Sequence, residues 1–320
     1  MDVVCLGILV ADMFASPMES LPEAGELKAI DHYLLSVGGC AANTAVDLRR
    51  LGRSVEVIGK VGPDMFGDFV IRELERHGAR AANIRRSPAL PTSSTVILNV
   101  HGQDRRYIHC IGANADFSPA DLDLAVLAGS RILYVGGYLA MPGFSPDDLG
   151  RLFHAAHERS LMTVLDVVIP AGLEVSLDHV RPVLPHTDYF LPNQDEARRL
   201  TGLDAPEDQA ARLATLNPAC TIVITRGARG SLTKHGEAFI ATPAFQVDAV
   251  DESGAGDAFA AGFITGLLEN WPLEYTLSFA AAAGASCTRA LGCHNGVFGF
   301  DDAIAFTAAH GRVSTASRRL

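Results

Sequence analysis

The chain contains 320 residues, of which 48% are hydrophobic and 20% are charged, and its formal net charge is −11 at pH 7. This composition is typical of a globular protein and excludes a disordered chain. Because nucleic-acid binding requires clustered Lys and Arg, the acidic balance argues against a nucleic-acid partner.

The N-terminus and the apolar segments give no export or membrane signal. No basic segment precedes the first apolar run, and no apolar run reaches the roughly 18 residues that a membrane span needs. The six cysteines are dispersed and form no CxxC pair, which is typical of reduced thiols in the cytosol. We therefore expect a cytoplasmic protein without a membrane partner.

Short apolar runs alternate with helical patterns along the chain. Five runs rich in Val, Ile and Leu predict buried strands at residues 3–7, 55–61, 132–136, 163–168 and 221–225. The stretches between them predict helices at residues 41–51, 65–77, 119–128, 146–159, 195–201 and 206–216. This alternation predicts an α/β protein with a mainly parallel sheet, in which ligands bind at the carboxyl ends of the strands.

Two segments depart from this alternation. Residues 94–100 and 106–111 alternate apolar and polar side chains around a polar turn, which predicts a β-hairpin. Residues 28–37 form another half-polar, strand-like run. We expect a small second sheet that either covers the active site as a lid or pairs with another subunit.

The first polar motifs lie near the N-terminus. Gly38 and Gly39 end a strand-like run, and Asn43 follows within the first turn or so of the next helix, where its amide faces a polar ligand, serves as a cap or faces solvent. Asp12 follows the first strand and a short turn, and by itself it is an ordinary loop residue.

Two more motifs follow later strands. Asn193 is a good helix N-cap, and Glu196 three positions on completes a capping box, so a purely structural role is as strong here as a functional one. In the segment Thr225-Arg226-Gly227-Ala228-Arg229-Gly230, a buried strand delivers a threonine and two glycines to its carboxyl end.

The segment 251–259 is the strongest local signal. Gly254, Ala255 and Gly256 present backbone N–H groups at the start of a long helix of small residues, which suits an anion. Asp257 would repel a permanent anion, but it fits a group that accepts a proton beside a reacting phosphoryl group. The chain has neither GxxxxGK[ST] nor GxGxxG here, which argues against a P-loop and a dinucleotide fold.

In this order, the four motifs resemble those of the ribokinase-like (PfkB-type) carbohydrate kinase family. The 38–45 segment resembles its N-terminal signature, and 251–262 resembles its C-terminal one, usually Asp-Thr-x-Gly-Ala-Gly-Asp. Asn193-x-x-Glu196 resembles its magnesium-associated motif, and Thr225-x-Gly227-x-x-Gly230 its nucleotide-side motif. The resemblance covers about residues 3–300.

The resemblance implies a three-layer α/β/α core with a small β-sheet lid. One domain would span residues 1–310, with lid segments at about 13–37 and 92–112, and a polar tail at 311–320 that we expect to fray. The implied activity is ATP-dependent phosphoryl transfer to a hydroxyl group, usually a primary CH2OH, of a sugar or sugar derivative. ATP and Mg²⁺ are the implied cofactors, with K⁺ as a further candidate.

The resemblance also implies a role for each motif residue. Asp257 would be the general base, beside an anion hole of Gly254, Ala255 and Gly256. Glu196 would hold Mg²⁺ partly through water, and Asp251 and Ser253 would hold a monovalent cation. The remaining residues would bind the substrate (Asp12, Gly38, Gly39 and Asn43) or the nucleotide (Asn193, Thr225, Gly227 and Gly230).

Several alternatives stay open at this point. Glu252 and Ser253 stand where the family commonly has Thr, and Glu252 leaves K⁺ activation in doubt. Arg226 could reach phosphate or solvent, and Arg105 and Arg106 could meet an anionic substrate or act as edge-strand charges. A nucleoside kinase would use aromatic residues such as Phe14, Tyr33, Tyr107 and Tyr138, and a non-catalytic sensor would keep only the binding site.

The resemblance further implies a homodimer that packs lid sheet against lid sheet. Apolar residues predicted on the outer lid face favour it, namely Leu34, Val96, Leu98 and Ile108. The alternative is that these residues cover the pocket of their own chain.

Overall fold

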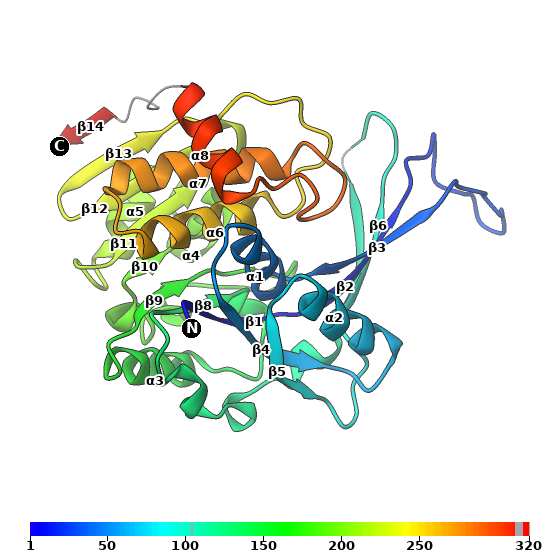
Figure 1. Cartoon of the computed structure of the whole chain (residues 1–320), viewed down its shortest axis with the longest axis horizontal. Coiled ribbons are helices and arrows are strands. Elements are labelled where there is room, and N and C mark those ends of the chain that lie inside the picture. The colour runs from blue at the N-terminus through cyan, green and yellow to red at the C-terminus, as the bar shows by residue number, and fades with distance from the viewer. Residues whose placement is uncertain (104, 311–315, 320) are drawn as a thin grey trace.

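The computed structural model describes residues 1–103, 105–310 and 316–319. A ten-stranded sheet runs through the molecule (Figure 1). Neighbouring strands from β5 to β11 are parallel, and β12 to β14 extend one edge in antiparallel fashion. In spatial order the strands are β14 (Ala316–Arg319), β13 (Ala238–Thr242), β12 (Ser231–His235), β11 (Thr221–Thr225), β10 (Tyr189–Phe190), β9 (Met162–Leu165), β8 (Ile132–Gly136), β1 (Val3–Gly7), β4 (Val55–Val61) and β5 (Arg80–Arg86).

Helices cover both faces of this sheet and bury a separate hydrophobic core on each. In β1, Val3 and Cys5 join one core, whereas Val4 and Leu6 join the other. The first core is covered by α1 (Cys40–Arg50), α2 (Met65–Arg76), α6 (Ala255–Leu268), α7 (Leu273–Cys287) and α8 (Phe300–Ala309). The second is covered by α3 (Pro146–His157), α4 (Gln194–Thr201) and α5 (Pro206–Ala214). The predicted three-layer α/β/α architecture is confirmed.

One predicted helix is wrong. Residues 119–128 form two short 3-10 helices, Pro119–Asp121 and Leu124–Leu127, in place of one α-helix. The backbone is extended at Leu122 and Asp123, and the Asp123 carboxylate accepts from the Ala125 N–H, which starts the second turn. A local side-chain bond of this kind competes with the helical hydrogen bond.

A four-stranded second sheet stands beside this body, at the right of Figure 1. Its spatial order is β3 (Tyr33–Gly38), β2 (Val10–Ala15), β6 (Ser94–Leu98) and β7 (Arg106–Cys110). The antiparallel β6–β7 pair is the predicted hairpin. We call this sheet the lid.

The two lid faces differ. On the inner face, Phe14 packs with Ile97, Leu34 and Cys293. Leu34 was expected on the outer face, but the strand alternation turns it inward and Leu35 outward. The strand register then sets an apolar row across all four strands on the outer face, formed by Leu35, Met13, Val96 and Ile108.

The end of the chain adds a strand at the sheet edge. Within the predicted tail 311–320, β14 pairs with β13, which the expectation of a frayed tail did not include; residues 311–315 and 320 lie outside the described residues. Across the ranges that the structure covers, no helix has both the length and the apolar character to cross a membrane.

Candidate active site

A cavity of about 170 Å³ lies at the carboxyl ends of the parallel strands. Asp166 follows β9, Asn193 follows β10, and Thr225 ends β11, and all three line the cavity. Glu196 on α4 and Asp257 on α6 line it from the helices. The location is the one where open α/β sheets bind their ligands.

The turn that starts α6 forms one wall of this cavity. Gly254 is the N-cap of α6 with φ 77°, and a Cβ there would lie 2.3 Å from the carbonyl oxygen of Cys293, so only glycine fits. A Cβ on Gly256 would meet no atom within 4 Å. The first N–H groups of a helix lack intrahelical partners and lie at the positive end of its dipole. Gly254, Ala255 and Gly256 line the cavity and bring the positive end of the α6 dipole to this wall, with the Ala255 N–H also donating to the Glu252 carbonyl oxygen at 3.3 Å.

Asp257 lies in the first turn of α6 and is held by α1. The Nδ2 atom of Asn43 donates to Oδ2 of Asp257 at 2.8 Å. Burial raises the pKa of Asp257, although hydrogen bonds from Asn43 and Cys40 oppose this shift. Asn43 is only 4% exposed, and its buried Oδ1 atom has no partner among the described residues. Asn43 is thus neither a cap nor a solvent-facing residue.

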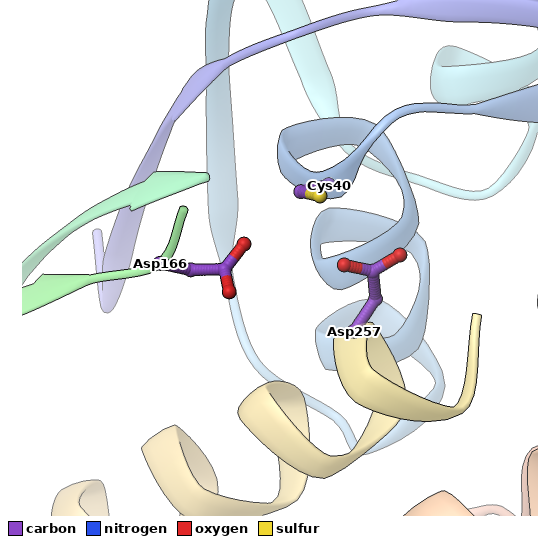
Figure 2. Close-up of side chains that lie close together, drawn as sticks. All are labelled: Cys40, Asp166 and Asp257. Atoms are coloured by element: carbon purple, nitrogen blue, oxygen red, sulfur yellow. The ribbon is translucent and has the colours of Figure 1, made fainter. Parts of the chain in front are cut away.

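Figure 2 shows Cys40, Asp166 and Asp257 close together, from the start of α1, the end of β9 and the start of α6. Ligand atoms of these three side chains all lie within 4.8 Å of one another. Burial, with the charges of Glu196 and Asp257, raises the pKa of Asp166 well above its usual range. Burial also raises the pKa of the Cys40 thiol, so it is protonated at neutral pH. Among the described residues that line the cavity, none is Lys or Arg. No cationic side chain of the lining therefore offsets the repulsion between these carboxylates.

Glu196 has two roles in the structure. Its Oε2 atom accepts from the Asn193 backbone N–H at 2.8 Å, and Asn193 Oδ1 accepts from the Glu196 N–H at 2.9 Å. The capping box is therefore present, and the same carboxyl group lines the cavity. Burial raises the pKa of Glu196 to about 7. The hydrogen bond from Asn193 acts to lower this pKa, and the negative charge of Asp257 acts to raise it.

The motif at the end of β11 has two parts, of which only Thr225 lines the cavity. Thr225 lines the cavity and forms a parallel bridge with Asn193. Gly227 and Gly230 bound a tight turn outside the cavity lining. A Cβ on Gly230 would lie 2.0 Å from the carbonyl oxygen of Thr242, so this glycine lets the turn close on β13. The Arg226 guanidinium donates to backbone carbonyls of the same segment.

Asp12 and Gly38 lie on the lid strands β2 and β3, Gly39 is the N-cap of α1, and all three lie outside the 170 Å³ cavity. Asp12 is on β2 and only 8% exposed. A Cβ on Gly38 would lie 1.8 Å from Oδ2 of Asp12, so the glycine makes room for the carboxylate. Burial raises the pKa of Asp12 to about 6, and the charge of Asp257 contributes to this shift. The carboxyl groups of Asp12, on the lid, and Asp257, on α6, therefore interact electrostatically.

Asp251 and Ser253 lie directly before the Gly254 turn and contact a cationic side chain of the lid. Nη1 of Arg105, between β6 and β7, donates to Asp251 Oδ1 and to Ser253 Oγ, each at 2.6 Å. Burial would raise the pKa of Asp251, but hydrogen bonds from Gly292 and Ser253 and the charge of Arg105 lower it below its usual value.

Two residues of this region were not predicted. Asp166 had a usable signal, because an aspartate directly after a buried strand lies at the ligand-binding edge, but it was counted inside the strand. Arg105 was considered as a contact to an anionic substrate or as an edge-strand charge, and its pairing with Asp251 was not predicted. Its partner lies 146 residues away in sequence, and no local pattern encodes that distance.

Comparison with known proteins gives these residues a context. A model of the pfkB family of carbohydrate kinases matches residues 1–297. The chain is 28% identical to a ribokinase of Bacillus subtilis, covering 86% of this chain and 89% of that protein. It is also 28% identical to a deoxyribokinase of Salmonella typhi, covering 89% and 92%. The structure of Arabidopsis thaliana ribokinase complexed with ribose and ATP superposes with a TM-score of 0.81 and 23% identity, covering 96% of this chain and 98% of that one.

Proposed function

The chain belongs to the pfkB family of carbohydrate kinases, and from this premise we propose that it transfers the γ-phosphoryl group of ATP to a primary hydroxyl group of a neutral sugar. Its being an ATP-dependent carbohydrate kinase follows from the family and from relatives that are sugar kinases. The acceptor and the residue roles are our inference. The observation that carries them is the half-buried Asp257 carboxyl group, which lines the cavity in the first turn of α6.

Asp257 is the general base in this proposal. A raised pKa makes its carboxylate a better proton acceptor than an ordinary aspartate, and Asn43 fixes its orientation. The substrate hydroxyl gives its proton to Asp257 as the hydroxyl oxygen attacks the γ-phosphorus. The N–H groups of Gly254, Ala255 and Gly256 stabilise the charge on the transferred group.

The acceptor sugar lies between the lid and α1. Asp12 supplies a buried carboxylate that accepts from sugar hydroxyls. The Oδ1 atom of Asn43 has no partner among the described residues and accepts from another hydroxyl. Gly38 and Gly39 contact the sugar through their backbone groups, because Asp12 and the Ile8 carbonyl group fill the space beside their Cα atoms.

The acceptor is neutral in this proposal because the candidate lid cations have other partners. Arg105 binds Asp251 and Ser253, and the Nη2 atom of Arg106 donates to Gln103 at 2.6 Å. Asp12 on the inner lid face and Asp257 below it would repel a carboxylate or phosphate on the sugar. A sugar acid or sugar phosphate therefore fits less well than a neutral sugar.

The cavity residues fit a magnesium ion. Asp166 and Glu196 offer hard oxygen donors, and the mutual repulsion of the cavity carboxylates favours a bound cation. Cys40 does not suit Mg²⁺, because its sulfur is soft and its thiol is protonated. Asp166 and Glu196, the latter partly through water, would hold the ion. When bound, Mg²⁺ neutralises charge on phosphate oxygens.

The nucleotide lies on the other side of the anion-binding turn. Asn193 and Thr225 line the cavity, and in this proposal their side chains contact phosphate or ribose groups. Gly227 and Gly230 shape the turn after β11 against which the nucleoside packs.

A nucleoside acceptor finds less support in the structure. Phe14 is fully buried in the lid core, and the Tyr138 hydroxyl donates to the His179 carbonyl. Tyr33 and Tyr107 are exposed at 61% and 55%. These rings do not assemble into one apolar slot for a base.

The lid also supports a homodimer. Its outer row of Leu35, Met13, Val96 and Ile108 crosses all four strands, and Ile108 is 64% exposed. Exposed apolar rows of this kind mark interaction surfaces. We propose that a second copy covers this row, and light scattering of the wild type against Ile108→Glu tests it.

A panel of acceptors tests the proposed function. Release of ADP would be measured with neutral pentoses and hexoses, sugar acids, sugar phosphates and nucleosides, each with Mg²⁺ and ATP. Asp257→Asn serves as the inactive control. Turnover with neutral sugars supports the proposal, whereas turnover confined to anionic sugars or nucleosides contradicts the assigned acceptor.

A further inference from the structure

We propose that the Arg105 guanidinium takes the place of a free monovalent cation at the Asp251–Ser253 turn. This chain therefore does not use a free monovalent cation there. The turn is ordered only when the lid hairpin, which carries Arg105, is docked against it. This inference rests on the proposed function for its kinetic part. Its binding part stands on the contacts of Arg105 alone.

The contacts leave little room for a free ion. Oδ1 of Asp251 accepts from Arg105 and from the Ser253 N–H, and Oδ2 accepts from the Gly292 N–H at 2.9 Å. The Ser253 hydroxyl accepts from the same Arg105 nitrogen. Both side chains expected to hold a monovalent cation are therefore bound to a guanidinium. The residues do not fit a free K⁺ ion in this arrangement.

Burial makes this ion pair more than a surface contact. The side chain of Asp251 is 3% exposed and that of Arg105 is 21% exposed. A pair of this kind is weakly screened, and loss of one partner leaves the other charge without compensation. The Tyr107 ring lies near the guanidinium, with its centroid 6.0 Å from Cζ of Arg105.

The position of the pair connects the lid to the reacting end of the site. Arg105 lies between β6 and β7, and Ser253 directly precedes Gly254, the N-cap of α6. Docking of the hairpin therefore brings a positive charge to the turn whose N–H groups bind the phosphoryl group. Arg105 acts through Asp251 and Ser253, so it is a positioning residue and not a catalytic one.

The first test uses the wild-type protein in K⁺-free buffer. Activity and the thermal unfolding midpoint would be compared in KCl and tetramethylammonium chloride, each on the order of 0.1 M so that screening is equal. We expect less than about a twofold change in activity, because a fixed guanidinium leaves no charge for K⁺ to neutralise. We also expect no K⁺-specific shift of the midpoint. Strong activation by K⁺, or a K⁺-specific stabilisation, would overturn the proposal.

The second test uses Arg105→Ala with Arg106→Ala as the matched control. We expect Arg105→Ala to lose at least about tenfold in kcat and to regain part of it with K⁺, since a buried unpaired carboxylate attracts a cation. Amide hydrogen exchange at residues 250–256 should become faster. Arg106→Ala should retain wild-type activity and exchange. Unchanged kcat and exchange in Arg105→Ala would contradict the proposal.

The readouts separate this inference from the function. If the wild type phosphorylates no acceptor, the proposed function fails, while the K⁺ dependence of the midpoint and the hydrogen exchange still decide the role of Arg105. If Arg105→Ala does not fold, the wild-type comparison decides alone.

Discussion

Asp251 and Asp257 lie on either side of the same glycine turn, and their surroundings are opposite. Asp251 accepts hydrogen bonds on both oxygens and pairs with Arg105, which lowers its pKa. Asp257 faces Asp166 and Cys40 without a cationic partner in the cavity lining, and its pKa is raised. The neutralised carboxylate fixes the turn, and the other keeps the affinity for a proton that a base needs.

Asp257→Asn gives the largest expected effect. Loss of the base should lower kcat by about 10²–10⁴-fold. The free energy of unfolding at pH 7.5 should rise, because the fold disfavours the ionised form of this carboxyl group. Steady-state kinetics and urea unfolding would measure both. Near-normal turnover would contradict the base role, and a marked loss of stability would contradict the electrostatic comparison.

Asp251→Asn should shift stability in the opposite direction. It leaves the Arg105 guanidinium without its counter-charge, and we expect a loss of about 2–3 kcal/mol in the free energy of unfolding, less than for a fully buried pair. Urea unfolding beside Asp257→Asn would measure it. If both variants changed stability in the same direction, the two carboxylates would not differ as described.

The pH dependence of stability sharpens the comparison further. Asp12 and Glu196 have folded pKa values raised to about 6 and about 7. The native state therefore keeps protons that the unfolded chain loses above about pH 4.5, so these two groups lower the free energy of unfolding as pH rises toward 7. In metal-free urea titrations at several pH values, Glu196→Gln should flatten this fall. An identical pH slope in wild type and variant would contradict the raised pKa of Glu196.

Asn43→Ala gives the smallest expected effect. Without the amide donor, the pKa of Asp257 should rise further, so the acid limb of the kcat profile should move to higher pH. The loss of the substrate-facing Oδ1 atom should raise KM for the sugar, each effect being about tenfold. A pH profile of kcat and KM separates these effects from simple destabilisation. An acid limb that stays in place would contradict the Asn43–Asp257 coupling.

The sequence predicted five strands of the main sheet because they form continuous apolar runs, as in Val3–Gly7. The two-residue strand β10 (Tyr189–Phe190) between β9 and β11 was missed because it is too short to form such a run. The edge strand β5 (Arg80–Arg86) was missed because its exposed positions carry arginines. The helix predicted at 119–128 failed because one Asp123 side-chain bond outweighed the helical pattern.

Within the site, prediction was limited by distance along the chain. Gly254 and Asp257 were found because a glycine turn and its helix are local in sequence. From the sequence, Glu196 was either part of a capping box or a metal ligand. In the structure it makes the capping hydrogen bond and also lines the cavity. The Arg105–Asp251 pair joins segments whose contact depends on how the lid docks, so no spacing predicted it.

The hydrogen bond between Asn43 and Asp257 also has a consequence for biosynthesis. It joins residues 214 positions apart, and the turn that starts at Gly254 is made after most of the chain has left the ribosome. A nascent chain that ends before this turn has neither the proposed base nor the anion-binding amides. Under the proposed function, a chain that ends before Gly254 therefore does not consume ATP, and phosphotransfer begins only after α6 has packed against α1.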